Sequence, residues 1–567
     1  MATTNSTREQ CLKRLGSLKL ERESWIAHWR DISDMILPRR GRFIVSDRNK
    51  GVRRNRKIID NTGTLAHRTM SSGLMSGITS PARPWFRLAT RHGQTMEDKQ
   101  LKAWLSDVEA LMREVFNRSN LYDSLAQLYD ELAAFGTAVL LVYEDFDDVI
   151  SCETLTAGQF CIAPDRRGRI DTLYREYSLT VGQVVDEFCP GNGDNRDFSR
   201  VSEAVKSAWN SGNRDTWIEI IQAIEPNPGY KPGPGPSKAK RYRSTWMEAN
   251  SSGDRLLRQS GFDEFPALVA RWNVAPSDIY GQSPAMDALG DVEQLQMQEI
   301  EKSKAIQKMV SPPLNVPASL QSNTVVNPLP NGTTFYNQAA GQLPMASPLY
   351  QVNPRLAEMQ ADMDAVRQRI RAAFYADLWL MISEMERSGV TAYEISIRRE
   401  EKLLMLGPVL ERLHHELLDP LIDRVFAIVA RAGLLPPVPD GLSDGGDLQV
   451  QYTSMLAQAQ RSVSTVAIER LFSFVGNLAA ANQAVLDKVD FDQAVDEYGE
   501  AIDAPARLIL SDADVAKIRE ARAQAQQQAQ AMQAATMMAQ NAQVLSKADT
   551  GGRNALTDIL SNVTGSV

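Results

Sequence analysis

Two short stretches contain residue types that would do chemistry if their spacing were right. His414, His415 and Glu416 carry the side chains of a zinc site, but the histidine pair at i and i+4 of H-E-x-x-H is missing. They fall inside a leucine-striped helix, where we expect exposed polar residues. The segment Gly73-Leu74-Met75-Ser76-Gly77 is out of register with the G-x-S-x-G nucleophile elbow and falls within a predicted helix. The sequence predicts no catalytic role for either stretch.

Other reaction classes also lack their signatures. The chain contains no G-x-x-x-x-G-K-[ST], so it lacks the backbone cradle and lysine of a P-loop ATPase. With five histidines and scattered carboxylates, no acid/base pair stands out. The four cysteines are irregularly spaced without C-x-x-C, which argues against a disulfide framework and a zinc site and favours a reducing cytoplasm. We therefore expect a structural protein rather than an enzyme, with no cofactor and no metal.

A basic stretch from Arg39 to Lys57 holds nine Lys or Arg residues against one acid, Asp47. It predicts either a phosphate-binding arm or, equally, a solvated loop or a contact with an acidic neighbour. The arginines of this candidate basic arm are Arg39, Arg40, Arg42, Arg53, Arg54 and Arg56.

Composition limits the class of protein. A chain of 567 residues is too long for one ordinary core, so several domains or an elongated multi-part subunit are expected. Its longest apolar run, Phe135 to Tyr143, is far shorter than the roughly 20 residues of a membrane span, and the N-terminal residues lack the apolar core of a secretory signal. The net charge of −8 is unlike a protein that grips nucleic acid over a broad surface, so DNA contacts should be local or weak.

Two long predicted helices bracket an irregular segment. The first, 284–310, starts at Ser283-Pro284, a capping hydroxyl followed by a proline at the first helical position. The second, 355–386, carries one continuous apolar stripe from Leu356 to Met381. Between them, seven prolines occur over residues 312–348, and a structureless segment of that length is rare unless it is functional. Because the first helix is sparsely apolar, we expect other copies of the chain to cover part of the stripe.

The remaining patterns predict a mainly helical chain with one α+β region. Apolar spacing predicts helices over 7–37, 59–79, 98–117 and 121–135, and strands follow in an α+β region over 135–275. A long helix from Leu406 to Ile428 should kink at Gly407-Pro408. Residues 521–545 form an Ala/Gln/Met tract with eight Gln and no charge after Arg522. Alone this tract would be a floppy or aggregation-prone helix, whereas around a symmetry axis it would form a bundle or barrel.

An ordered set of motifs resembles the portal, or head-to-tail connector, proteins of short-tailed bacteriophages over residues 20–510. Each motif is weak alone, but together they follow the family's order. They are Trp29-Arg30-Asp31, Asp60-Asn61-Thr62, Pro84-Trp85-Phe86, Phe135-Gly136-Thr137-Ala138, Arg271-Trp272, Tyr280-Gly281-Gln282-Ser283-Pro284, Lys308 to Pro313, Val390-Thr391-Ala392-Tyr393-Glu394, Leu406-Gly407-Pro408-Val409 and Tyr452-Thr453-Ser454.

The resemblance implies a mainly α subunit with an α+β wing, in which wing, stem, clip and crown assemble into a ring, with twelve copies expected. The implied parts are the N-terminal wing (1–280), stem helix 1 (281–310), clip (311–354), stem helix 2 (355–380), tunnel loop region (381–396), kinked helix and C-terminal wing (397–450), crown (451–510) and the helical tail (511–567), which lies outside the match.

The resemblance also implies a role and partners. The ring would stand at one capsid vertex of the virion, after assembly in the host cytoplasm. Double-stranded DNA would pass through it during packaging and ejection. The clip would dock the terminase large subunit and later tail adaptor proteins, and major capsid and scaffolding proteins would surround the ring.

Specific residues are expected at these places. A ring that guides DNA gains by not binding it, so we expect a mostly acidic lumen with isolated basic contacts. A tunnel loop is expected near 380–394, where an ordinary helix connection is the alternative. Candidate DNA contacts are Lys302, Lys308 and Arg387, candidate tunnel-loop residues are Met385, Ser388 and Gly389, and candidate clip docking residues are Pro312, Pro313, Asn331, Gly332 and Tyr336.

Other readings stay open at this point. Another oligomeric virion component, such as a tail adaptor or internal protein, would share the helical content and the absence of catalysis. A helical DNA-binding scaffold would bind DNA tightly with a steep salt dependence. A DNA-processing enzyme is disfavoured because no carboxylate cluster for metal ions stands out.

Overall fold

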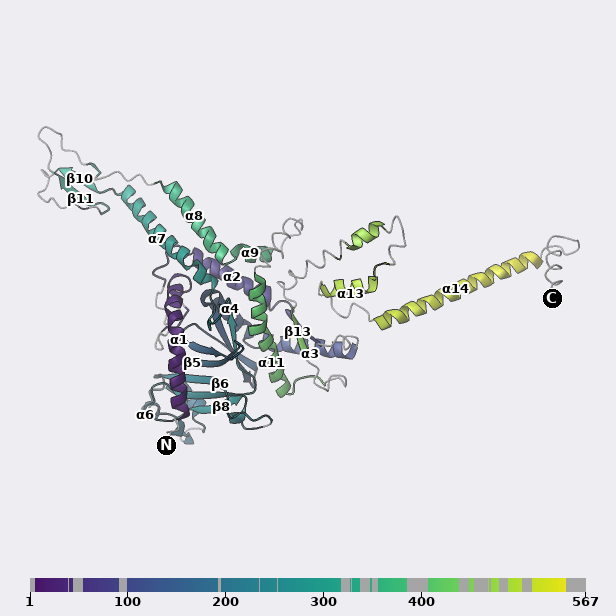
Figure 1. The fold of residues 1–567 in the computed structure, drawn as a ribbon, viewed down its shortest axis with the longest axis horizontal. Helices are drawn as coiled ribbons and strands as arrows, with labels where there is room; N and C mark the ends of the chain where they lie inside the picture. Colours follow the sequence, from purple (N-terminus) through teal and green to yellow (C-terminus); the bar gives the residue numbers. More distant parts are fainter. Residues whose placement is uncertain are drawn as a thin grey trace. The chain divides into compact units, whose positions relative to one another are not determined.

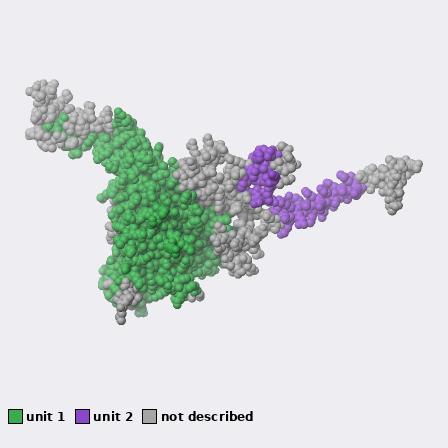
Figure 2. Space-filling view, in the orientation of Figure 1, with its two compact units in different colours: residues 1–461 green, residues 462–567 purple. Residues whose placement is uncertain are grey.

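The computed structural model is mostly helical, with sheets that are mainly antiparallel. It describes residues 6–38, 40–43, 55–90, 99–191, 195–233, 235–251, 253–317, 327, 329–336, 347–348, 355–384, 406–437, 448–452, 468, 471–478, 488–501 and 512–546. The chain divides into two compact units, residues 1–461 and 462–567, coloured separately in Figure 2. No helix among the described residues is long and apolar enough to cross a membrane.

The N-terminal helices begin and end where capping residues and prolines in the sequence predict. Helix α1 (Thr7–Met35) starts at Ser6, whose hydroxyl accepts a hydrogen bond from the Glu9 N–H at 3.2 Å, and it ends before Pro38. Its buried Trp29 donates its indole N–H to the Phe135 carbonyl at 3.1 Å. The other predicted helices are also confirmed, as α2 (Thr62–Ile78), α3 (Lys99–Arg118) and α4 (Leu121–Phe135).

Gly136 ends α4 and starts the first sheet. Its φ of 73° is the left-handed conformation that favours glycine at a helix end. A Cβ at this position would lie 2.2 Å from the Gly281 carbonyl oxygen, so the backbones of two distant segments touch here. The predicted helix-to-strand break is confirmed.

Two antiparallel sheets form the predicted α+β region (Figure 1). In the first, β2 (Thr137–Asp145) lies between β3 (Val149–Leu155) and β9 (Ala267–Arg271). The second contains, in spatial order, β4 (Phe160–Pro164), β5 (Ile170–Thr180), β6 (Trp217–Pro226), β7 (Tyr242–Glu248) and β8 (Arg258–Phe262). The short helices α5 (Val181–Phe188) and α6 (Glu203–Asn210) pack on this second sheet with their own small apolar core.

A two-stranded sheet joins distant parts of the first unit. Strand β1 (Phe86–Thr90) pairs antiparallel with β13 (Leu448–Tyr452), so that Phe86 lies opposite Tyr452. The crown was expected to begin at residue 451, and here Gln451 and Tyr452 belong to β13. Residues 453–467 lie outside the described part.

Helices α7 (Pro284–Val310) and α8 (Leu356–Ala373) lie side by side in Figure 1, with the small sheet of β10 (Leu314–Pro317), β11 (Thr333–Tyr336) and β12 (Ser347–Pro348) beyond the end of α7. The bounds predicted for the first long helix are confirmed. The prediction of one continuous second helix is wrong. Helix α8 stops at Ala373, Tyr375 adopts a φ of 52°, and a separate helix, α9 (Ala376–Glu384), follows. The break lets Leu378 and Trp379 turn into the core.

The expectation that other copies cover the apolar stripe of α8 also needs correction. Met363, Val366, Ile370 and Phe374 are buried within one chain, because α2 and α7 both pack on α8. The exposed apolar side chains lie instead on the outer half of α7.

The helix after residue 405 has an irregular turn that the sequence did not predict, and the expected kink at Gly407-Pro408 adjoins residues 385–405, which lie outside the described part. Helical geometry holds over 406–413, through Gly407-Pro408, and changes to a π turn, η6 (His414–Leu418), just before α11 (Asp419–Arg431). Pro420 lacks an N–H and its ring meets the carbonyl four residues earlier, which explains the wider turn there.

In the second unit, α13 (Phe491–Ala501) and α14 (Asp512–Ser546) are joined by an ion pair between Asp492 and Arg519 at 2.6 Å. Helix α14 contains the predicted Ala/Gln/Met tract. Its large apolar side chains are exposed, with Met532 at 75% and Met538 at 74%.

Candidate functional site: a braced pair of helices

The base of α7 is fixed by its first residues. The Ser283 hydroxyl accepts from the Met286 N–H at 3.1 Å and donates to the Ala134 carbonyl at 2.7 Å. Ser283 is fully buried, and Pro284 occupies the first helical position. The predicted start of the helix is confirmed, and its cap also attaches the helix to the end of α4.

Polar pairs link the two long helices along their length. Arg369 of α8 contacts Asp291 of α7 at 2.8 Å, and the Gln298 amide donates to Asp362 at 2.6 Å. Exposed pairs of this kind contribute little each, so they set alignment more than stability.

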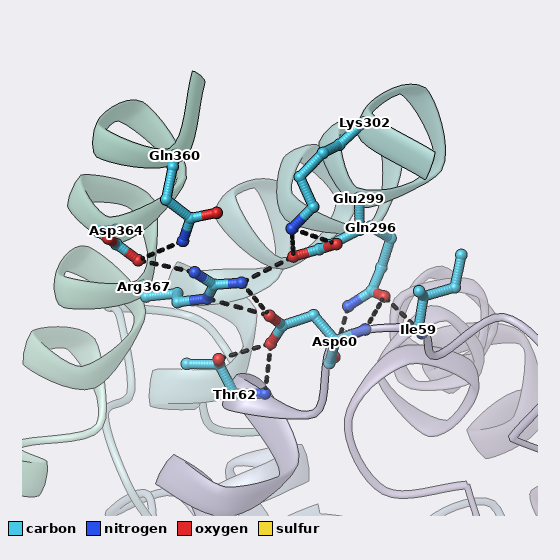
Figure 3. Close-up of polar contacts among 9 residues, drawn as sticks. All are labelled: Ile59, Asp60, Thr62, Gln296, Glu299, Lys302, Gln360, Asp364 and Arg367. Carbon is cyan, nitrogen blue, oxygen red and sulfur yellow. Dashed lines mark hydrogen bonds and ion pairs between the residues drawn. The ribbon is translucent and has the colours of Figure 1, made fainter. Parts of the chain in front are cut away.

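One partly buried network ties both helices to the loop before α2 (Figure 3). The Arg367 guanidinium of α8 lies between the Asp60 carboxylate, at 2.8 Å, and the Glu299 carboxylate of α7, at 2.7 Å. Lys302 contacts Glu299 at 2.8 Å, and Asp364 contacts Arg367 at 2.7 Å. We call these five residues, with Gln296 and Thr62, the polar brace.

Gln296 of α7 completes the polar brace by binding the backbone of the same loop. Its side-chain oxygen accepts from the N–H groups of Ile59 and Asp60 at 2.7 and 2.9 Å, and its amide donates to the Asp60 carbonyl at 2.8 Å. A single side chain thus satisfies three backbone groups, and it is only 4% exposed.

Asp60 is held in its ionised form. Burial alone would raise the pKa of its carboxyl, but hydrogen bonds from Thr62 and Arg367 outweigh burial and hold the pKa below its usual range. Thr62 donates its N–H at 2.8 Å and its hydroxyl at 2.5 Å. A carboxylate bound this fully is a fixed anchor and is a poor proton carrier.

The predicted DNA-contact residues occupy different environments. Lys302 belongs to the polar brace and is committed to Glu299. Lys308 lies half-buried in the last turn of α7. Arg387 and the tunnel-loop residues Met385, Ser388 and Gly389 lie outside the described residues. The structure therefore leaves the tunnel loop a prediction.

The predicted docking residues gather around the small sheet. Pro313 is buried, Pro312 is half-buried, and Tyr336 ends β11. Asn331 is exposed with a φ of 59°, and its N–H binds the Ser311 carbonyl at 3.1 Å. Gly332 is buried against Asn327, where a Cβ would lie 2.6 Å from the Asn327 carbonyl oxygen.

Two described arginines of the candidate basic arm, Arg40 and Arg42, contact the chain itself. Arg40 lies 3.9 Å from Glu131 and 4.0 Å from Asp130. Arg42 donates to the Ser178 hydroxyl at 3.0 Å. Arg56 is exposed, and Arg39, Arg53 and Arg54 lie outside the described residues.

The histidine stretch also differs from expectation. Glu416 is not an exposed helix residue, because its carboxylate binds the buried Arg271 at 2.5 Å. His414 is half-buried and stacks on Tyr452 with ring centroids 4.2 Å apart. His415 is exposed as predicted. Within the described residues, no group of His, Cys, Asp and Glu side chains is placed to hold a metal.

Sequence reasoning missed Arg367 and Gln296, and it noted Asp60 only as part of a motif. Asp60-Asn61-Thr62 is a local signal, because an Asp two residues before a helix start often binds the backbone there. No local signal pairs Asp60 with Arg367, which lies 307 residues away.

The whole chain can also be compared with known proteins. A family model described as bacteriophage head to tail connecting protein matches residues 8–510. The chain belongs to this family. It is 44% identical over 554 residues to the "Probable portal protein" of Bordetella phage BPP-1, covering 97% of this chain and 98% of the relative. It is also 44% identical over 553 residues to the "Portal protein" of Salmonella phage epsilon15, with the same shares covered.

A solved structure is distantly similar. A chain of the "Virion of native gene transfer agent (GTA) particle" matches at 11% identity with a TM-score of 0.32, covering 83% of this chain and 98% of that one. This similarity is too weak to support an argument about the fold.

Membership in the family decides the class of protein. The chain is a portal protein of the head-to-tail connection, located at the portal vertex of the phage virion, and it is a structural component rather than an enzyme. The family also implies an oligomeric ring in the capsid.

Proposed function

We propose that twelve copies of this chain form a ring around an axial channel for double-stranded DNA, with α7 and α8 as the stem. On this proposal the small sheet β10–β12 belongs to the clip, residues 1–280 and 397–450 form the wing, and residues 451–510 form the crown. The clip docks the terminase large subunit during packaging and tail adaptor proteins afterwards. Major capsid and scaffolding proteins hold the ring at the vertex.

The observation that carries the proposal is the exposed apolar surface of the outer half of α7. Met297 is 67% exposed and Ile306 is 41% exposed. These two residues are nine positions apart, which is about two and a half helical turns, so they lie on opposite sides of the helix. A subunit in a closed ring contacts two neighbours through two different surfaces. Two apolar sides on one helix suit that arrangement.

The polar brace supports the same proposal. A stem that lines a channel must keep its angle to the body while DNA moves past, and Arg367 fixes both helices to Asp60. Because Lys302 is neutralised by Glu299, this part of α7 offers DNA no unpaired lysine. An acidic or neutral wall binds phosphates weakly, which suits passage of DNA.

Ring formation is tested by the mass of the purified oligomer together with averaged electron micrographs viewed down its axis. We expect a closed ring with an axial hole. We also expect Met297→Asp and Ile306→Asp each to prevent ring closure while leaving the subunit's unfolding midpoint unchanged, since both side chains are exposed in one chain. Gln294→Asp is the control, because Gln294 is an exposed polar residue of the same helix.

A monomer or an open filament from the unaltered protein would contradict the proposal. So would rings formed equally well by the Met297→Asp and Ile306→Asp variants. A ring with an axial hole that assembles only onto completed heads would favour a tail adaptor instead.

A further inference from the structure

The hairpin turn between β4 and β5 presents three arginines to solvent. Arg166, Arg167 and Arg169 are all exposed, and none of their side chains makes an ion pair or hydrogen bond within the described residues. Arginines elsewhere in the same sheet behave differently. Ion pairs there join Arg175 to Glu153, Arg243 to Glu225 and Arg258 to Glu187.

The backbone of this turn is fixed by the Asp165 side chain. Its carboxylate accepts hydrogen bonds from the N–H groups of Arg167 and Arg169 at 2.7 and 2.9 Å. The Gly168 N–H binds the Asp165 carbonyl at 3.1 Å, and Gly168 has a φ of 81°. This is a tight hairpin turn with glycine in the left-handed position. It holds the three Cα atoms in one arrangement.

A partly buried ion pair between Arg271 and Glu416 also holds the backbone of the turn. Arg271 donates to the Gly168 carbonyl at 3.1 Å while the same guanidinium binds Glu416 at 2.5 Å. Arg271 is only 7% exposed. A ligand that binds a turn held this way orders little additional backbone, which lowers the entropic penalty of binding.

The charge balance at the turn is positive. Three guanidinium groups stand against Asp165, whose carboxylate is already used by two backbone N–H groups. The next carboxyl, Asp171, has a pKa raised by burial and by the charge of Asp165, and the positive charge of Arg14 on α1 opposes that rise. Arg14 is exposed as well. The turn is therefore a compact cationic projection.

We propose that this arginine turn, Asp165 to Arg169, binds the phosphate backbone of double-stranded DNA without reading its sequence. Guanidinium groups bind phosphates as bidentate forks, and contacts to the backbone position a protein without specifying sequence. A protein partner is disfavoured, because the cores of protein interfaces are apolar or aromatic and the turn has no such side chain. This proposal rests on the proposed DNA-channel function and adds a second place of contact, away from the stem.

The binding should be weak and dependent on salt. Three arginines neutralise few phosphates, and the rest of the chain is acidic, with a net charge of −8. In a ring the turns repeat, so weak contacts add without holding DNA in one register. Such contacts suit DNA that must stay close to the protein and still slide.

The test is fluorescence anisotropy of a duplex DNA with the full-length assembled protein, between about 50 and 200 mM salt. The variant Arg166→Ala, Arg167→Ala, Arg169→Ala should lower affinity by at least about tenfold at low salt. It should also reduce the slope of log K against log salt by about 1 for each arginine removed. The control is Lys206→Ala, Lys231→Ala, Lys238→Ala, which removes the same charge from exposed positions of the same region. An Arg→Lys triple variant should recover part of the affinity.

Electron micrographs of each variant are taken in parallel. Equal DNA affinity and salt slope for the arginine variant and the unaltered protein would overturn the proposal, as would an equal loss in the lysine control. If the arginine variant fails to form rings while the lysine control forms them, the turn contacts another copy and the proposal is also wrong. If the unaltered protein forms no ring, the proposed function fails, and the anisotropy comparison still tests the arginine turn separately.

Discussion

Glu131 is a buried acid at the junction of α4 with the basic stretch. It is fully buried, accepts the Ala157 N–H at 3.0 Å and lies 3.9 Å from the Arg40 guanidinium. Burial raises the pKa of Glu131 from 4.5 to about 7, and Arg40 opposes that rise only in part. Asp130 also faces this region, and its carbonyl contacts the His67 ring at 2.9 Å.

The raised pKa makes stability depend on pH. Between 4.5 and about 7 the folded chain binds more protons at Glu131 than the unfolded chain, so the free energy of unfolding falls as pH rises. We expect Glu131→Gln to be more stable than the unaltered protein at about pH 8 by roughly 3 kcal/mol, since one pKa unit is about 1.4 kcal/mol. Below about pH 4 this advantage should disappear.

Denaturant unfolding at the two pH values measures the difference. Glu114→Gln, at an exposed carboxyl of α3, serves as the control and should change stability little at either pH. A Glu131→Gln effect that is the same at both pH values would show that the proton on Glu131 is not responsible.

At the scale of elements, the contact of α9 with α2 depends on a glycine. A Cβ on Gly73 would lie 2.5 Å from the Trp379 ring, and Trp379 is 2% exposed. The glycine pair of this stretch has a packing role, with no part in the nucleophile motif that it resembles. The turn at Tyr375 brings Trp379 to that place.

We expect Gly73→Ala to destabilise the protein by about 1 to 3 kcal/mol, because a well-packed core resists added volume. Gly290→Ala is a matched change in α7, where nothing lies within 4 Å of the added Cβ. It should stabilise by roughly 0.5 to 1 kcal/mol through helix propensity. Thermal unfolding checks both, and equal effects from the two substitutions would refute the packing account.

Local signals explain which elements could be predicted. The caps and the apolar periodicity of α1, α4 and α7 depend on residues close together in the sequence. The predicted bounds of these helices therefore agree with the observed bounds within a few positions. The break at Tyr375 carries no proline or glycine, and the tertiary contact of Trp379 decides it. The predicted α+β region contains β4, β8 and β9, but their bounds could not be predicted, because these strands are only five residues long and depend on neighbouring strands.

The candidate site was less predictable than the fold. The family motifs led to α7 and α8, but the polar brace joins residues that lie 68 and 307 positions apart in the chain. A charged residue on a helix surface looks the same in sequence whether it meets solvent or a partner. The partners of Arg367 and Lys302 could therefore be identified only from the structure.

At the scale of the whole molecule, the first unit has a core of its own. The large apolar cluster draws on α1 to α4, the sheet around β2, α7, α8 and α11, and it contains no residue of α14. Strand β13 pairs with β1 within this unit.

Deletion of residues 512–567 should therefore leave the unfolding midpoint of the first unit unchanged. Deletion of residues 448–567 is the comparison, and it should lower the midpoint because β1 loses β13 and Tyr452 leaves His414. Differential scanning calorimetry of both truncated chains checks this. A lower midpoint after the shorter deletion would show that the tail contributes to the core.

The polar brace gives the helix pair the mechanics of a lever. Helix α8 is held along its length by contacts such as that of Arg367 and at its base by the buried Phe374. A sideways force on strands β10 to β12 would then rotate α7 and α8 about the base of α8 at Phe374. Packed interiors transmit strain, so the reaction force enters the body at Asp60, beside the first turn of α2. The turn at Tyr375 separates α8 from α9, so we expect such a load to bend α9 less than α8.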